Sequence, residues 1–306
     1  MAREVANSSG ARPSRIASVA ALVGALVWGI EARAQTPSEA PAQAPGEARS
    51  QAPNGTCSQS PAPPPNARIA GNGRWRTISG IVGPGRRTRR IYVLLPEGYD
   101  RETSRRYPVL YVHDGETMAD DSLAVRPTLD ALVTANEVEA AIVVGVGVSE
   151  HRDDEMKPPI LQQYARFLVD VVRPFIDSRF RTRCGRSSTM MLGYSLGGLA
   201  AFYLALWHPD VFGRTACMST SFWWGGERPR RDLRQYRGTL PERLWVDVGT
   251  LEPGLGRARA IRDTAIARGM VLGRDLGYFE DRGVAHGFES GGRRLGRVLR
   301  FLLSSP

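Results

Sequence analysis

Gly193-Tyr194-Ser195-Leu196-Gly197, followed directly by Gly198, places a serine between glycines at the spacing of a nucleophile elbow. In such an elbow a strand reverses sharply into a helix, and the strained turn projects the central side chain outward. The positions two before and two after the serine must be small, because the strand and helix backbones nearly touch there. The stretch therefore predicts a strand, a tight turn that exposes Ser195, and a helix.

The sequence on either side of this turn fits the prediction. Residues 189–192 form a short apolar run typical of a buried strand, and residues 199–207 form an apolar, helix-favouring segment that stops at His208-Pro209. The glycine–serine pattern alone arises by chance in a glycine-rich chain, and a tight turn whose serine bonds its own backbone is the alternative. The strand–turn–helix context favours Ser195 as a nucleophile.

The first seventy residues lack the pattern of a folded domain. Residues 1–34 combine early arginines, an apolar run and Ala32-Arg33-Ala34, which is the layout of a signal peptide cleaved after Ala34. An uncleaved anchor is the alternative. Residues 35–70 are rich in Ala, Pro, Ser and Gln, a composition that predicts a disordered tether. Residues 71–306 are long enough for one catalytic α/β domain.

Charge and cysteine content exclude several kinds of partner. The chain of 306 residues has a formal net charge of +10, and Lys157 is its single lysine. Its arginines are spread along the chain without an interleaved aromatic stripe, so we expect no nucleic-acid partner. The odd number of cysteines (Cys57, Cys184 and Cys217) leaves at least one thiol unpaired within the chain. Their spacing is not that of a metal site, and we expect neither a metal nor a cofactor.

Short apolar runs alternate with helix-favouring segments through the rest of the chain. This alternation predicts an α/β fold, a mostly parallel sheet with helices on both faces. Ligands in such sheets bind at the carboxyl ends of the strands, and Ser195 follows one of those ends. The expected strands are residues 89–95, 107–112, 141–148, 189–192, 215–219, 244–249 and 276–281. The expected helices are residues 162–175, ending near Pro174, and residues 199–207, 256–268 and 293–303.

A serine hydroxyl needs a base near neutral pH, and in this architecture the chain order is serine, acid, histidine. The chain has four histidines. His113 and His151 precede Ser195, and His208 lies at the far end of the helix that follows it. Elimination therefore leaves His286, in a glycine-flanked loop after the last strand, as the expected base.

The acid that orients the base is expected in the loop after the strand at residues 244–249. Glu252 lies in that loop and is the preferred candidate. Asp247, inside the strand, and Asp281, at the end of the last strand, remain the alternatives.

The other candidate site residues follow the ends of predicted strands. An oxyanion hole needs two backbone N–H groups, and we expect one from Leu196 and the other from Gly115 or Glu116, after the strand at residues 107–112. Gly115 permits a close backbone approach. Trp223 and Trp224 follow the strand at residues 215–219 and are candidate substrate-binding residues, with a pair at the edge of the core as the alternative.

Seven segments together make the chain resemble a known family. They are residues 91–96 (IYVLLP), 107–115 (YPVLYVHDG), 145–152 (GVGVSEHR), 193–198 (GYSLGG), 208–212 (HPDVF), 247–252 (DVGTLE) and His286. The chain resembles the putative esterase family of α/β hydrolases, which includes enterochelin esterase-like, feruloyl esterase-like and esterase D-like enzymes. The resemblance implies an α/β-hydrolase fold, Ser195 as nucleophile and His286 as base.

One departure from that family concerns the wall of the pocket. Relatives carry a tryptophan or a similarly bulky residue shortly after the catalytic histidine. Here Phe288 and then Ser290-Gly291-Gly292 occupy that stretch. The departure bears on the shape of the pocket and leaves the expected chemistry unchanged.

The expected function is that of an exported serine esterase that acts through an acyl-enzyme, periplasmic or secreted. We expect a small-molecule or saccharide-linked ester as its substrate, and no stable membrane insertion after cleavage. An acyltransferase on the same scaffold is the alternative among enzymes, since both reactions share the acyl-enzyme. A catalytically inactive hydrolase fold that serves as a binding module is the alternative from another class.

Overall fold

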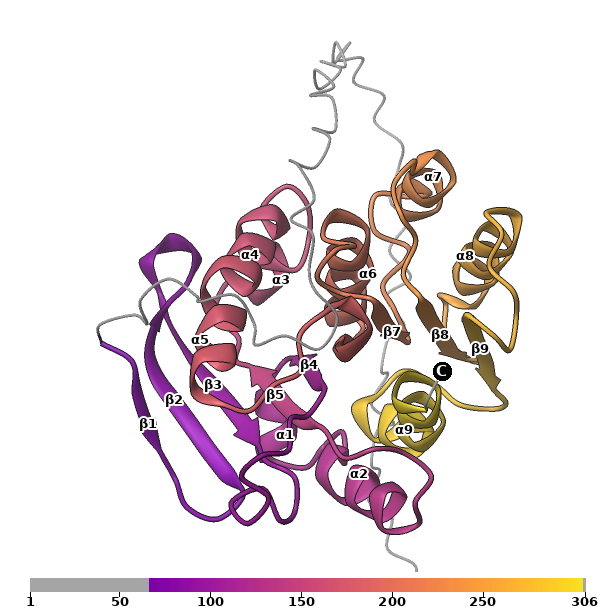
Figure 1. Ribbon diagram of the computed structural model, residues 1–306. Helices are drawn as coiled ribbons and strands as arrows, with labels where there is room; N and C mark the ends of the chain where they lie inside the picture. Colours follow the sequence, from indigo (N-terminus) through magenta and orange to yellow (C-terminus); the bar gives the residue numbers. More distant parts are fainter. Residues whose placement is uncertain (1–65, 305–306) are drawn as a thin grey trace, which may run out of the picture. The chain divides into compact units, whose positions relative to one another are not determined.

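The computed structural model describes residues 66–304; the predicted signal peptide at residues 1–34, the predicted tether at residues 35–70 as far as residue 65, and Cys57 lie outside the described residues. The described residues build one sheet of nine strands in the order β1-β2-β3-β5-β4-β6-β7-β8-β9 (Figure 1). The strands from β5 to β9 along this order run parallel, whereas β1, β2 and β3 form an antiparallel edge beside β5. The strands are β1 (Arg68–Ala70), β2 (Trp75–Val82), β3 (Thr88–Leu94), β4 (Val109–His113), β5 (Ile142–Val146), β6 (Thr189–Tyr194), β7 (Arg214–Met218), β8 (Arg243–Gly249) and β9 (Leu276–Asp281).

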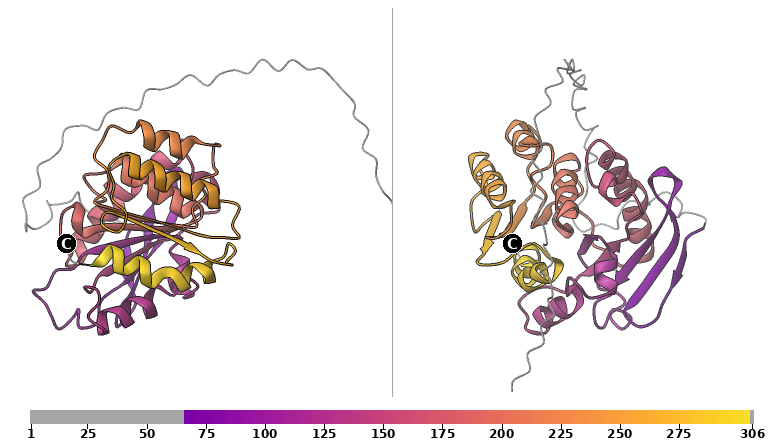
Figure 2. Two further views of the ribbon diagram at one scale, coloured as in Figure 1. Left: turned by 90° about the vertical axis from the view of Figure 1, so that its right-hand side faces the viewer. Right: turned by 180° about the vertical axis from the view of Figure 1, so that it is seen from behind.

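Helices cover both faces of this sheet (Figures 1 and 2). One face carries α1 (Glu116–Ala119), α2 (Val125–Thr134) and α9 (Phe288–Leu303). The other face carries α3 (Arg152–Glu155), α4 (Leu161–Phe167), α5 (Arg173–Arg179), α6 (Leu196–Trp207), α7 (Arg228–Gln235) and α8 (Leu255–Ala267). The mostly parallel sheet with helices on both faces, expected from the alternating pattern, is thus confirmed.

Two hydrophobic cores fill the spaces between the sheet and its helices. In β4, Val109 and Tyr111 pack into the core that contains α4, α5 and α6, whereas Leu110 and Val112 pack into the core that contains α2 and α9. Continuous apolar strands are expected where both faces of a sheet are covered. The packed sheet fixes the carboxyl ends of β4, β6, β7, β8 and β9 at one edge, and the loops that leave this edge carry the predicted site residues.

The folded domain begins before the predicted boundary at residue 71. β1 pairs with β2 in antiparallel register, with Arg68 opposite Ser79 and Ala70 opposite Thr77. Residues 68–70 therefore belong to the sheet, and the predicted tether is too long at this end. All three residues of β1 are exposed, so no apolar alternation indicates the strand in the sequence.

The helical segment predicted at residues 162–175 continues beyond Pro174. α4 passes into a π-helical turn (Leu168–Val172), and α5 follows from Arg173 to Arg179. Pro174 lies in the first turn of α5, where a missing backbone N–H costs no helical hydrogen bond. The prediction that the helix ends near Pro174 is wrong because the proline begins a new segment.

Within residues 66–304 no helix is long and apolar enough to cross a membrane. Cys217 is a free cysteine, buried in β7, and Cys184 is disulfide-bonded.

Candidate active site

Ser195 lies at the junction of β6 and α6, on the carboxyl edge of the sheet. Its φ of 57° and ψ of −119° are rarely adopted by residues other than glycine. β6 ends at Tyr194 and α6 begins at Leu196, so the chain reverses at this single residue. The predicted strand, turn and helix are therefore present, with a strained serine at the turn.

The glycines around Ser195 allow the close approach that this reversal needs. A Cβ on Gly193 would overlap the carbonyl group of Gly197 at the start of α6. A Cβ on Gly198 would overlap the hydroxyl of Thr220, in the loop after β7. A side chain at either position would push α6 away from β6 or from that loop, and Ser195 would move with it.

Three side chains from separate loops meet at this edge. The Oγ of Ser195 lies 3.2 Å from Nε2 of His286, which belongs to the loop between β9 and α9. The Nδ1 of His286 lies 2.8 Å from Oε2 of Glu252, in the loop after β8. With Nδ1–H donating to Glu252, the neutral imidazole presents the Nε2 lone pair to the serine hydroxyl. This is the geometry of a nucleophile, a base and an orienting acid.

Glu252 is held on both carboxylate oxygens and is only 6% exposed. Its Oε1 accepts the backbone N–H of Gly249 and the hydroxyl of Ser219, each at 2.7 Å. Burial raises the pKa of this carboxyl, but the hydrogen bonds from His286, Ser219 and Gly249 outweigh burial, and the net pKa lies below its usual value. Glu252 is thus kept as a carboxylate facing the imidazole.

The two alternative acids lie elsewhere. Asp247 is fully buried in β8, where its Oδ2 accepts the indole N–H of Trp245 at 2.7 Å and its Oδ1 lies 3.4 Å from Nη1 of Arg294. Asp281, at the end of β9, meets this loop cluster through its backbone carbonyl, which accepts the N–H of Thr250. Of the three candidates, the structure brings Glu252 against His286.

Tyr194 holds the loop that carries His286. Its ring lies against the imidazole, with 4.9 Å between ring centroids, and its hydroxyl accepts the backbone N–H of Gly287 at 2.7 Å. Phe288 packs against the same tyrosine ring, also with 4.9 Å between centroids. Tyr194, which directly precedes Ser195 in the chain, therefore holds the loop that carries His286. Its place inside the elbow motif was the signal that could have pointed to this role.

The predicted oxyanion-hole residues need one correction. The N–H of Gly115 donates to the carbonyl oxygen of Val146 at 2.9 Å, so it extends the ladder between β4 and β5 and does not face the site. The glycine is required for another approach, since a Cβ there would lie 2.5 Å from the backbone of Gly145 in β5. Leu196 and Glu116 are the first residues of α6 and α1, and first-turn N–H groups have no acceptor within their own helix. These two residues remain the candidate donors.

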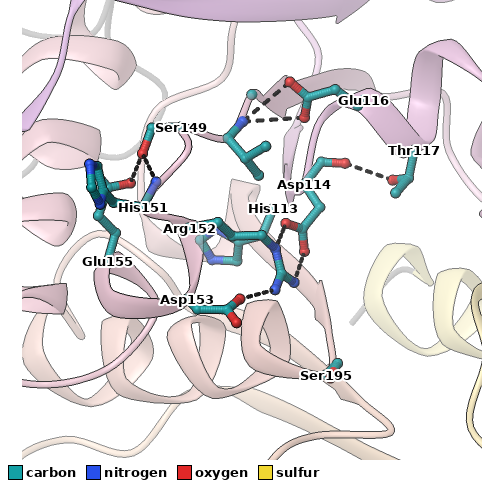
Figure 3. Close-up of polar contacts among 12 residues, drawn as sticks. His113, Asp114, Glu116, Thr117, Ser149, His151, Arg152, Asp153, Glu155 and Ser195 are labelled. Atoms are coloured by element: carbon teal, nitrogen blue, oxygen red, sulfur yellow. Dashed lines mark hydrogen bonds and ion pairs between the residues drawn. The ribbon is translucent and has the colours of Figure 1, made fainter. Parts of the chain in front are cut away.

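The loop that carries Glu116 is held from two sides, as Figure 3 shows. The guanidinium of Arg152 grips both carboxylate oxygens of Asp114, with 2.7 Å between Nη2 and Oδ2. The carboxylate of Glu116 accepts the backbone N–H of Val148, with 3.2 Å to Oε2. The loops after β4 and β5 therefore support each other beside Ser195.

Trp223 and Trp224 lie in different environments. Trp223 is 54% exposed. Trp224 packs edge-on against Tyr203, with 6.3 Å between ring centroids, and the guanidinium of Arg228 lies 5.5 Å from its ring. Trp224 therefore fits the core-edge alternative, and Trp223 remains the candidate for substrate contact.

Other side chains reach the site without having been predicted. The hydroxyl of Ser221 lies 3.3 Å from that of Ser195, and its N–H donates to the Ser195 carbonyl. Ser219 and Ser221 follow β7 at the carboxyl edge, so the rule that selected Glu252 could have found them. Arg294 lies in the second turn of α9, and no sequence motif pointed to it. In the part of the chain that the structure describes, no three His, Cys, Asp or Glu side chains gather in a way that could hold a metal ion.

The chain is similar to known esterases in sequence. The profile of the family described as "Putative esterase" matches residues 85–290. The iron(III) salmochelin esterase of Escherichia coli O6:H1 is 28% identical over 149 residues, covering 47% of this chain and 35% of that protein. The iron(III) enterobactin esterase of Escherichia coli strain K12 is 30% identical over 177 residues, covering 56% of this chain and 40% of that protein. The matches thus span less than half the length of these two relatives.

The fold is also that of known esterases. A solved structure of a ferulic acid esterase superposes with a TM-score of 0.61 at 19% identity, and the match covers 78% of this chain and 98% of that one. At 19% identity the match shows the fold alone, and it confirms the α/β-hydrolase architecture expected from the sequence.

Proposed function

The chain belongs to the putative esterase family, and on that premise we propose that it hydrolyses a carboxylic ester through an acyl-enzyme formed on Ser195. The observation that carries the proposal is the pair of contacts at His286, 3.2 Å to the Ser195 hydroxyl and 2.8 Å to the Glu252 carboxylate. A serine in this setting loses its proton to the imidazole as it attacks, and the carboxylate stabilises the imidazolium that forms.

Acylation begins with the attack of Ser195 Oγ on the ester carbonyl carbon. The hydroxyl proton passes to Nε2 of His286, and the carbonyl oxygen becomes an oxyanion. Backbone N–H groups of Leu196 and Glu116 are the proposed donors to this oxyanion, since charge that develops in the transition state is best stabilised by donors already in position. When the tetrahedral intermediate collapses, His286 returns the proton to the departing alcohol oxygen.

Deacylation repeats these steps with water. His286 takes a proton from a water molecule, the resulting hydroxide attacks the acyl carbonyl, and the acid leaves as Ser195 regains its proton. The side chain of His286 is 46% exposed, so water can reach the imidazole without a conformational change. This access supports hydrolysis as the outcome.

The proposed substrate is a small-molecule or saccharide-linked ester with an aromatic acyl group. The names of the relatives refer to iron(III) salmochelin, iron(III) enterobactin and ferulic acid. In this chain, Trp223 offers an exposed aromatic ring two residues after Ser221, whose hydroxyl touches that of the nucleophile. A flat, exposed indole ring suits an aromatic ring better than an anionic group.

The catalytic proposal is tested with a fluorophosphonate probe and p-nitrophenyl acetate. The probe should label Ser195, and Ser195→Ala should abolish labelling and lower turnover by several orders of magnitude. Ser221→Ala is the matched control because the Ser221 hydroxyl lies 3.3 Å from that of Ser195, and mass spectrometry should still map the label to Ser195 in that variant. A label on Ser221, or near-parental turnover in Ser195→Ala, would contradict the proposal.

We also propose export, with a mature chain that begins at Gln35. The arginines near the start, the apolar run and the small residues at positions 32 and 34 support it. N-terminal sequencing of periplasmic or secreted material should give Gln35 as the first residue. Recovery of intact Met1 in a membrane fraction would instead indicate an uncleaved anchor.

A further inference from the structure

A buried arginine lies close to the acid of the proposed triad. Arg294 lies in α9 and is 2% exposed, which is unusual for an arginine. Its Nη2 donates to the hydroxyl of Ser219 at 2.6 Å, and that hydroxyl donates to Oε1 of Glu252 at 2.7 Å. A chain of two hydrogen bonds therefore connects the guanidinium to the carboxylate that faces His286.

The second terminal nitrogen of Arg294 lies between two carboxylates. Nη1 is 3.4 Å from Oδ1 of Asp247 and 3.8 Å from Oε1 of Glu252. Neither contact has hydrogen-bond geometry, and Nη1 has no hydrogen-bond partner within residues 66–304. This nitrogen therefore acts on both carboxylates through its charge. The arginine thus supplies one positive charge to two buried negative ones.

The groups that face this cluster come from several strands and loops around it. Asp247 comes from β8 and Glu252 from the loop after it, with Ser219 from the loop after β7. The other titratable groups here are Tyr194 of β6, His286, which contacts Oε2 of Glu252, and the thiol of Cys217 in β7, whose pKa is raised by burial and by the charge of Asp247. Two buried carboxylates in one cluster repel each other, and removal of a buried cation would leave them uncompensated.

We propose that Arg294 is a positioning residue of the triad, which fixes Glu252 through Ser219 and keeps that carboxylate ionised toward His286. The proposal rests on the function proposed above. Arg294 touches neither the nucleophile nor the base, so its effect on the reaction passes entirely through Glu252. Asp247 affects the net charge of the cluster, because its carboxylate lies beside the same guanidinium as the carboxylate of Glu252.

The charge balance has a consequence for activity at low pH. Burial raises the pKa of Asp247 to about 6, and Arg294 opposes that rise. If the guanidinium is replaced by an apolar side chain, the pKa values of both carboxyls rise, and the cluster takes up a proton at a higher pH. Loss of this positive charge also favours protonation of the neighbouring His286–Glu252 pair, which must stay unprotonated at Nε2 to accept the serine proton, so the acidic limb of the kcat/KM profile then moves upward.

The test uses Arg294→Met, which keeps an unbranched side chain without the charge. We expect kcat to fall about tenfold to hundredfold, because a small misplacement of a catalytic group has effects of that size. KM should stay near the parental value, because a residue this deeply buried cannot reach the substrate. The acidic limb should move up by about one pH unit, as loss of a neighbouring opposite charge typically gives.

Three further variants separate charge from packing. Arg294→Lys keeps the charge but not the two-pronged geometry, so it should restore the pH profile without restoring kcat. Asp247→Asn combined with Arg294→Met removes both members of the ion pair and should regain at least part of the lost kcat and the parental acidic limb. Arg293→Met is the matched control, since Arg293 is the exposed neighbour on the same helix, and it should behave like the parent.

A second readout does not depend on ester turnover. The Nδ1 proton of His286 should give a resolved low-field NMR signal in the parent, held by Glu252, and this signal should shift or broaden in Arg294→Met but not in Arg293→Met. If the parent hydrolyses no ester, the proposed function is wrong, but the NMR signal still tests whether Arg294 positions Glu252 against His286. A parental signal and a parental pH profile in Arg294→Met would overturn the proposal. So would a loss of kcat that matches the loss of folded protein and that Asp247→Asn does not relieve.

Discussion

Ser195, His286 and Glu252 each occupy a position that the surrounding chain makes costly to change. Ser195 holds a positive φ. Glu252 is a carboxylate that is almost completely buried, and an unpaired carboxylate in that environment would be strongly unfavourable. The three hydrogen bonds on Glu252 offset that cost, and one of them is the bond to His286. The acid is therefore held in place whether or not a substrate is present.

Replacement of Glu252 by glutamine should lower kcat by about 10²–10⁴-fold and leave KM nearly unchanged, in line with the loss of the third member of a triad. An amide can keep the contact with His286 but cannot stabilise the imidazolium. Steady-state kinetics with a p-nitrophenyl ester measure the effect, and Asp281→Asn serves as the control with parental activity. If Asp281→Asn is the more damaging change, the acid has been assigned to the wrong residue.

The two tryptophans should respond differently to truncation. Trp223→Ala should raise KM for feruloyl and other aromatic esters more than for acetyl esters, because the exposed ring is free to contact a bulky acyl group. Trp224→Ala should instead lower the melting temperature, because it removes a ring that packs on Tyr203. Kinetics with both ester types and thermal unfolding test the pair. An equal effect on the two esters in Trp223→Ala would show that this ring does not contact the acyl group.

The junction of β6 and α6 depends on glycine more than on any other residue type. Gly193→Ala should destabilise the fold by about 2 kcal/mol or more, because its Cβ would overlap the backbone of Gly197 and neither element can move without displacing Ser195. Gly256→Ala, in the first turn of α8, is the matched control. Apart from its chain neighbours and the backbone of its own helix, no described atom lies within 4 Å of a Cβ at Gly256, so alanine there should be neutral or stabilise by up to about 1 kcal/mol. Urea unfolding measures both, and a tolerated Gly193→Ala would contradict the close approach described here.

The strands buried on both faces could be predicted because their sequences are continuous apolar runs, as in β5 and β6. In the antiparallel edge, β3 was predicted as a strand at residues 89–95, but β1 and β2 were not. β1 is exposed at every residue, and β2 has an irregular register between Ile78 and Ile81, so neither has a clean alternation. α9 begins at Phe288, five residues before the predicted start, because Gly291 and Gly292 weaken the helical pattern there. Gly291 is required by the nearby ring of Tyr194, a tertiary contact that local sequence does not reveal.

The candidate site could be predicted where chain order and the carboxyl-edge rule apply. Ser195, Glu252 and His286 each follow a strand of the parallel sheet, and the packing of that sheet brings the three together. Arg294 and the engaged N–H of Gly115 could not be predicted, because each depends on which neighbour a side chain or a backbone group meets in three dimensions. Local rules therefore located the residues of the proposed triad, whereas the contacts that hold them could be found only in the folded structure.

His113 makes the stability of the whole domain depend on pH. The residue ends β4 in the interior, where its Nδ1 lies 3.0 Å from the hydroxyl of Tyr164. Burial lowers the pKa of His113 to about 3, and the charge of Arg152 acts in the same direction. Below about pH 6.5 the His113 imidazole binds a proton in the unfolded chain but stays neutral in the folded state. The free energy of unfolding should therefore fall as the pH falls from about 6.5 toward 3, with a contribution from His113 of up to about 1.4 kcal/mol per pH unit.

Urea unfolding of His113→Gln between pH 4 and pH 7 tests this dependence. Glutamine keeps a polar group near Tyr164 but does not titrate, so the variant is expected to be less stable at neutral pH and to have a slope that is lower by about one proton. His151→Gln is the matched control, because His151 is exposed and its replacement should leave the slope unchanged. Equal slopes in the parent and in His113→Gln would mean that the acid sensitivity comes from other groups, and that the His113 imidazole can be protonated without unfolding the domain.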